Sequence, residues 1–105
     1  MFDERNLSRL NELGEGADRA WEAFRTFDQA ALEDGAIPKK YKELIALGVA
    51  LTTQCGYCLA VHRKAAIAAG VTQEELAETA FVAAALRAGA AVTHGTHLLP
   101  EKEGS

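Results

Sequence analysis

The chain has 105 residues, 49% of them apolar, and its 11 basic and 15 acidic side chains give a net charge of −4. This length predicts one domain, covering residues 1–105, with a single modest core. An acidic chain without a basic cluster excludes the surfaces that bind nucleic acid. No apolar run reaches the length of a membrane span and no signal peptide is visible, so we expect a cytoplasmic protein that does not associate with a membrane.

The apolar spacing predicts an all-α fold, because no segment alternates with period two for long enough to form a strand. Leucines with helical spacing precede a break at Gly14 and Gly16. An aromatic stripe begins after Ala17, which predicts a helix whose aromatic face packs in the core. Its members are Ala20, Trp21, Phe24, Phe27 and Ala31. We expect Asp34–Gly35 to end that helix, with the glycine in a left-handed cap.

Pro38 is expected to begin the next helix, since its missing N–H costs nothing in a first turn. The nearby Lys39, Lys40 and Lys42 are most simply a solvated face. Glu43 follows in a helix that is apolar on more than one side, where a buried carboxylate would need a partner. The alternative for Glu43 is an exposed acid in the first turn, favoured there by the helix dipole.

The only cysteines of the chain, Cys55 and Cys58, have the spacing C-x-x-C, and His62 follows four residues after Cys58. On one helix, residues 58 and 62 lie one turn apart on the same face. A thiol beside a base at a helix start is the arrangement that makes a cysteine nucleophilic at neutral pH. The pattern therefore indicates redox or metal chemistry, and not a disulfide scaffold.

Symmetry about a turn places Glu43 near His62. Thr52, Thr53 and Gln54 interrupt two apolar runs, so a turn there would make the flanking helices antiparallel. Glu43 and His62 are equally far from that turn and would lie side by side. A carboxylate in that position can orient an imidazole and stabilise its protonated form.

The helix with the cysteines is expected to run from about Cys55 to Ala69 and to end at Gly70. Thr72 and Glu75 form a capping box that predicts the start of the last helix, which extends to about Val92. Alanine on several faces of that helix favours burial against another subunit, so we expect a homo-oligomer.

The arrangement Glu-x11-Cys-x-x-Cys-x3-His resembles the alkylhydroperoxidase-D-like branch of the carboxymuconolactone decarboxylase family. The likeness covers roughly residues 36–95, including KELIALGVALTTQCGYCLAVHRKAAIAAGVTQEELAETAFVAAALRAG. The decarboxylase branch of the family lacks the cysteine pair. The resemblance implies a compact all-α subunit with a central antiparallel helix pair that carries the C-x-x-C, assembled as a trimer or hexamer.

The resemblance also implies an antioxidant enzyme, a thiol peroxidase or disulfide reductase with no cofactor and no metal. Cys58 would attack the peroxide, His62 would be its base and Glu43 the orienting acid, while Cys55 would close a redox-active disulfide. An external dithiol, lipoyl-bearing or thioredoxin-like, would reduce that disulfide. Tyr57 stands where some members carry a histidine; it is a possible accessory group that donates a hydrogen bond but is a poor base.

Two other interpretations remain open. Cys55, Cys58, His62 and Glu43 are acceptable zinc ligands, although structural C-x-x-C zinc sites usually have a second ligand pair elsewhere. The chain could also be a helical oligomerisation module whose cysteines are merely buried. The opposite order of cysteines is a further alternative, because in thioredoxin-like sites the first cysteine attacks. His94 and His97 have metal-ligand spacing but no companions, and are most simply a polar helix end.

Overall fold

The structure, a computed structural model, describes residues 2–102. Every regular element in this part of the chain is helical, as the sequence predicts. In chain order the elements are η1 (Glu4–Arg9), α1 (Leu10–Glu15), α2 (Asp18–Leu32), α3 (Lys39–Thr53), α4 (Gly56–Ala68), α5 (Gln73–His94) and η2 (Gly95–Leu98), where η marks a 3-10 helix.

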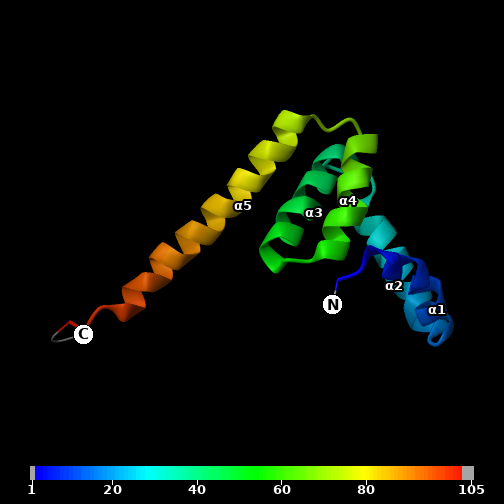
Figure 1. Cartoon of the computed structure of the whole chain (residues 1–105), viewed down its shortest axis with the longest axis horizontal. Coiled ribbons are helices and arrows are strands. Elements are labelled where there is room, and N and C mark those ends of the chain that lie inside the picture. The colour runs from blue at the N-terminus through cyan, green and yellow to red at the C-terminus, as the bar shows by residue number, and fades with distance from the viewer. Residues whose placement is uncertain (1, 103–105) are drawn as a thin grey trace.

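The centre of the molecule is an antiparallel hairpin of α3 and α4, which pack along each other (Figure 1). The first half of α5 packs against α3, and η1 lies against α4. The buried core is small. Its main cluster is Leu47, Ala66 and Val71, with Leu44, Leu59 and Leu76 partly buried around them; Ala50 and Ala83 are also buried.

The turn between α3 and α4 falls where the polar residues interrupt the apolar pattern. Gln54 adopts a left-handed conformation (φ 58°, ψ 40°) that ends α3, and the N–H of Cys55 donates to the carbonyl of Ala50 at 3.0 Å. The hydroxyls of Thr52 and Thr53 both donate back to the carbonyl of Val49. These bonds satisfy helix-end carbonyls and reverse the chain within two residues.

The start of α5 has the predicted capping box. The Thr72 hydroxyl accepts the N–H of Glu75 at 3.1 Å, and the Glu75 carboxylate accepts the N–H of Thr72 at 2.8 Å. That second bond, with the nearby Lys40 ammonium, holds the pKa of Glu75 below its ordinary value of 4.5. The stabilisation from this carboxylate is therefore present above the unfolded-state pKa and is lost as the pH falls through the lowered folded-state value.

Thr72→Ala is expected to lower the free energy of unfolding by about 1 kcal/mol, because it removes the side-chain half of the cap. Urea unfolding at fixed protein concentration measures the change. Thr96→Ala is a matched control near the other end of α5, where the hydroxyl of Thr96 only donates to a carbonyl of the preceding turn. An unchanged unfolding midpoint for Thr72→Ala would show that the cap does not hold this helix start.

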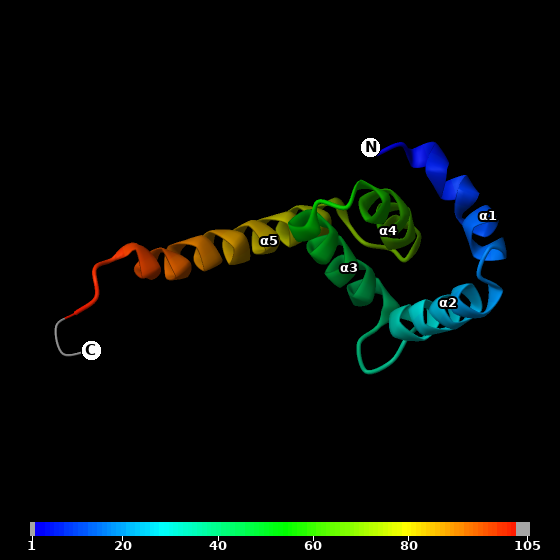
Figure 2. The ribbon, with the colours of Figure 1, turned by 90° about the horizontal axis from the view of Figure 1, so that it is seen from below.

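Beyond its first turns, α5 leaves the hairpin and projects away from it (Figures 1 and 2). The radius of gyration is 18.4 Å, against about 13 Å for a compact chain of this size. The expectation of a compact subunit is therefore wrong for the single chain. Ala83 packs against the hairpin side, whereas most apolar side chains of this helix and its extension are exposed. The large ones among them are Phe81, Val82, Leu86, Val92, Leu98 and Leu99.

By length and composition alone, Gln73–Leu98 meets the criteria for a membrane-spanning helix. This differs from the expectation that no segment would do so. Core helices of soluble proteins meet the same criteria but are mostly buried, whereas only 6% of this stretch is buried within the single chain. Glu74, Glu75 and Glu78 all lie in the first two turns of this helix, and Arg87 lies further along. The expectation that the chain does not associate with a membrane stays a prediction.

The segment before the hairpin differs from the prediction in two respects. No residue of α2 is buried, and Phe24 and Phe27 are exposed within this chain, so the predicted packing of the aromatic stripe in the core is wrong for the single subunit. The physical reason is that α2 contacts only α1 and the start of α3. Gly35 does not adopt a left-handed conformation either; α2 ends at Leu32, with an extended Glu33.

Gly14 has a clear steric role where α1 packs on α2. A Cβ at that position would overlap the ring of Trp21. The glycine is buried and allows the indole to lie directly on the backbone of α1. Gly14 itself lies within α1, so the predicted break falls only at Gly16, which ends α1 before α2 begins.

Candidate active site

Glu43 is the only described residue of the chain that is both charged and buried, with 1% of its surface exposed. It lies one turn into α3, on the side that faces α4. Its Oε2 lies 2.7 Å from Nδ1 of His62, and its Oε1 accepts from Nζ of Lys39 at 3.0 Å. Both carboxylate oxygens therefore have a partner, as a buried charge requires.

The contact between Glu43 and His62 is the one that the symmetry of the hairpin predicts. His62 lies near the middle of α4, and its side chain is 19% exposed. Because a carboxylate only accepts hydrogen bonds, Nδ1 carries the proton in this contact and the lone pair of the neutral ring lies on Nε2. In the neutral ring, one nitrogen is thus anchored by Glu43 and the other can accept a proton.

The two cysteines lie at the start of α4 and form a disulfide with a Cα–Cα distance of 5.3 Å. Cys55 is the N-cap residue, and its Sγ accepts the N–H of Cys58 at 3.2 Å. This sulfur thus occupies the place where the unpaired N–H groups and positive end of a helix stabilise negative charge. Both cysteines are half-buried, so they are not sealed inside this chain.

Cys58 and His62 share one face of α4, four residues apart, as the sequence predicts. The hairpin thus brings together all four residues that the sequence pattern singles out. Glu43 comes from α3, and the two cysteines and His62 come from the turn and α4. In order along α4, the disulfide is followed by the imidazole that the buried carboxylate holds.

Lys39 belongs to this cluster, and sequence reasoning missed it. The three lysines at the start of α3 are not simply a solvated face. Lys39 pairs with Glu43, Lys40 pairs with Glu75 on α5 at 3.2 Å, and Lys42 donates to the carbonyl of Glu33. The lysine–glutamate spacing of four residues was the available signal for the first of these pairs. Pro38 is the N-cap of α3, and Lys39 is its first residue.

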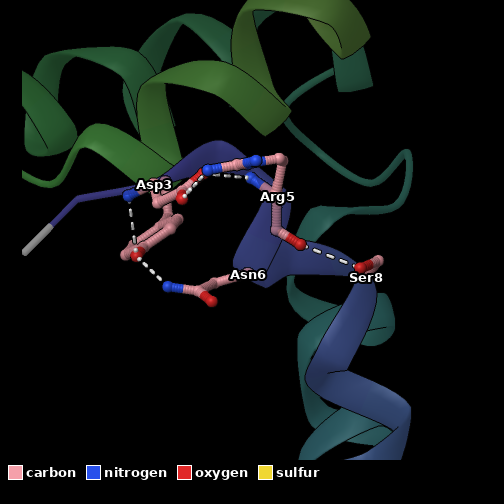
Figure 3. Close-up of polar contacts among 5 residues, drawn as sticks. Asp3, Arg5, Asn6 and Ser8 are labelled. Carbon is pink, nitrogen blue, oxygen red and sulfur yellow. Dashed lines mark hydrogen bonds and ion pairs between the residues drawn. The ribbon is translucent and has the colours of Figure 1, made fainter.

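Tyr57, the possible accessory residue, contacts the N-terminal segment of the chain. Its hydroxyl accepts from the backbone N–H of Asp3 and from Nδ2 of Asn6, both at 3.1 Å (Figure 3). The ring packs edge-on against Phe2, with ring centroids 4.7 Å apart. A Cβ on the neighbouring Gly56 would lie 2.8 Å from that phenyl ring, so the segment packs closely on the residues between the two cysteines.

His94 and His97 lie at the far end of α5, with ring centroids 6.1 Å apart. Within residues 2–102, no group of three His, Cys, Asp or Glu side chains is arranged to hold a metal ion. In the disulfide form the two cysteine sulfurs are bonded to each other and provide no thiolate ligands.

Two open surfaces flank the hairpin. An apolar groove of about 540 Å³ runs between α3 and α5, lined by residues that include Ile45, Val49, Val82 and Leu86. A second cleft, of about 700 Å³, lies between α2 and the start of α3 and is lined by Trp21, Phe24 and Arg25 among others. Lys39 lies on the edge of this second cleft, so the buried cluster reaches solvent at that side.

The fold and site define a class of all-α protein in which a helical hairpin holds a C-x-x-C disulfide beside a buried glutamate–histidine pair. The sequence profile of the carboxymuconolactone decarboxylase family matches residues 18–101. The chain therefore belongs to the carboxymuconolactone decarboxylase family.

Several individual proteins are similar to this chain. Uncharacterized protein 4 in the cox locus of Paracoccus denitrificans is 42% identical over 93 residues, which cover 89% of this chain and 81% of that protein. A carboxymuconolactone decarboxylase family protein from Legionella pneumophila is 32% identical and superposes with a TM-score of 0.75, over 79% of this chain and 74% of that one. A Methanobacterium thermoautotrophicum protein, also 32% identical, superposes with a TM-score of 0.77 over 82% and 97% of the two chains.

Proposed function

We propose that this family member is a thiol-dependent peroxidase or disulfide reductase of the alkylhydroperoxidase-D-like kind. The observation that carries the proposal is the 2.7 Å contact between Glu43 and His62, on the helix whose first turn bears the cysteine pair. A buried carboxylate that fixes the tautomer of an imidazole is the usual support for a general base. A helix whose cysteines are only structural does not need a carboxylate that orients a histidine.

The proposed cycle begins with the reduced pair. Nε2 of His62 takes the proton of the Cys58 thiol, and the thiolate attacks the terminal oxygen of a hydroperoxide. The O–O bond breaks, the alkoxide leaves as an alcohol after protonation, and Cys58 becomes a sulfenic acid. The Cys55 thiolate then attacks the Cys58 sulfur, the S–O bond breaks, water leaves and the disulfide forms. An external dithiol supplies the two electrons that reopen the disulfide.

The contact at the helix start suits Cys55 for the second of these steps. The N–H of Cys58 that reaches its sulfur stabilises a thiolate at that position. A thiolate there is ready to attack an adjacent sulfenic acid, which is the role of a resolving cysteine. The same contact is also the strongest support for the reverse order, in which Cys55 attacks the peroxide.

Counting thiols before and after one equivalent of peroxide tests the proposed function, with metal analysis on the same sample. We expect two titratable thiols in the reduced protein, none after peroxide, and no stoichiometric metal. Two thiols that remain after peroxide, with one zinc ion per chain, would replace the peroxidase with a zinc site.

We further propose that the chain works as a homotrimer or homohexamer assembled through the exposed apolar face of α5. The accessible surface of the single chain is 8,399 Å², whereas a compact monomer of this mass exposes about 5,700 Å². The excess of roughly 2,700 Å² per subunit is in the range of obligate interfaces. The exposed aromatic residues of α2 would find partners in the same assembly.

Ala84→Glu or Ala85→Glu is expected to break this assembly, because each places a bulky charge on an exposed, alanine-rich part of α5. Light scattering should show a fall from the mass of an oligomer to that of one chain. Ala36→Glu adds the same charge in the exposed connection between α2 and α3 and should leave the mass unchanged. A stable monomer of about 11 kDa for the unmodified protein at micromolar concentration would refute the proposal.

A further inference from the structure

Glu43 has two partners, and the proposed reaction uses only one of them. The second is Lys39, whose ammonium lies 3.0 Å from Oε1 of Glu43 while His62 binds Oε2. Lysine and glutamate lie four residues apart on α3, so one helical turn aligns them. The backbone N–H of Lys39 also donates to Oδ1 of Asp34 at 2.7 Å, which fixes the start of the helix that carries the ammonium.

The charges of the cluster explain why a cation is needed there. With Lys39 present, the ammonium balances the Glu43 carboxylate, and His62 and the Cys58 thiol are neutral. Transfer of the thiol proton to His62 creates an imidazolium and a thiolate, so the total charge stays at zero. Without the ammonium, the negative charge of the buried carboxylate favours a protonated His62, and a protonated ring cannot act as a base.

On α2, Arg25 and Asp28 line the same cleft as Lys39. On the other elements around this cluster, several charged groups have partners of their own. Glu75 on α5 pairs with Lys40, Glu4 on η1 pairs with Lys64 of α4, and Lys42 donates to a backbone carbonyl. Arg63, the remaining cation of α4, is exposed. Of the charged side chains in these contacts, Lys39 alone reaches the Glu43 carboxylate.

We propose that Lys39 is a positioning residue that balances the charge of Glu43 and so keeps His62 neutral and able to accept a proton. The inference rests on the proposed function for its catalytic consequence, but the contact itself can be tested without any reaction. Lys39 lies at the edge of the cleft between α2 and α3 and its side chain is half-exposed. Replacing it should therefore leave the fold intact.

The test compares Lys39→Met with Lys39→Arg, which keeps the charge, and with Lys42→Met, a matched control three residues along the same helix. NMR titration of the His62 ring in the disulfide form, assigned with His62→Gln, reports its protonation in the absence of peroxide. We expect Lys39→Met to move the midpoint to higher pH, Lys39→Arg to restore it, and Lys42→Met to leave it unchanged.

Peroxide kinetics supply the second readout. At mildly acidic pH, Lys39→Met should react with peroxide more slowly than the unmodified protein, by up to about tenfold, because loss of the cation beside Glu43 favours the protonated form of His62. The deficit should shrink as the pH rises, which a purely structural defect would not produce. An unchanged His62 titration in Lys39→Met would overturn the inference.

The two hypotheses fail separately. A shifted His62 titration in a protein whose thiols do not react with peroxide would support the Lys39 contact and remove the peroxidase. A reactive protein with an unshifted titration would support the peroxidase and show that Lys39 is only a surface partner of Glu43.

Discussion

Replacing Cys58 with serine is expected to slow the reaction with peroxide by about three orders of magnitude, because a serine hydroxyl stays protonated beside the same base. Cys55→Ser should still react at Cys58 and stop at a sulfenic acid, which a dimedone-type trap would detect. The reason is positional. Cys58 shares a face of α4 with His62, while Cys55 caps the helix and receives an N–H bond instead.

The reverse result has a clear structural meaning. If Cys55 forms the trapped sulfenic acid in Cys58→Ser, the N–H bond at the helix start controls reactivity more than the histidine does. Cys58 would then be the resolving thiol, as in thioredoxin-like sites. The Glu43–His62 pair would serve the second thiol in that case.

Glu43→Gln and His62→Gln should each slow turnover by roughly two to four orders of magnitude, the usual contribution of general acid–base assistance. The double variant should be little slower than the slower single variant, because groups that act as one unit are strongly non-additive. The 2.7 Å contact is the physical basis for this expectation. Circular dichroism and light scattering on each variant separate a catalytic loss from unfolding. Glu43→Gln is more prone to unfold the protein than His62→Gln, because Glu43 is fully buried.

Losses that multiply in the double variant would contradict the pairing. They would mean that the carboxylate and the imidazole act on different steps, and that the contact is a structural salt bridge. A large loss in Glu43→Gln with a normal rate in His62→Gln would assign the base to another group.

The sequence predicts the hairpin and its contents well, because local rules govern them. The Thr–Thr–Gln interruption predicts the turn, the capping box predicts the start of α5, and equal distance from the turn predicts the Glu43–His62 contact. Each depends on residues close in sequence or on simple helix geometry. Lys39 is the local feature that was missed, since a lysine near a helix start is usually solvated.

The elements outside the hairpin were harder to predict, because their environment is set by what covers them. A stripe such as Trp21, Phe24 and Phe27 indicates that one face of α2 must be buried, but not by which surface. In the single chain that face stays largely open, and α5 likewise extends beyond the hairpin. The packing of Phe2 on Gly56 joins segments more than fifty residues apart, which no local pattern encodes.

The central claim is that Cys55 and Cys58 form a redox couple that peroxide oxidises and a dithiol reduces. Intact-mass spectrometry tests it most directly, on the reduced protein, after one equivalent of peroxide, and after excess dithiol. The account predicts a loss of two hydrogens on oxidation, mapped to a peptide that links Cys55 to Cys58, and a return to the starting mass. A mass that peroxide leaves unchanged, or a stable zinc adduct on the same cysteines, would contradict it.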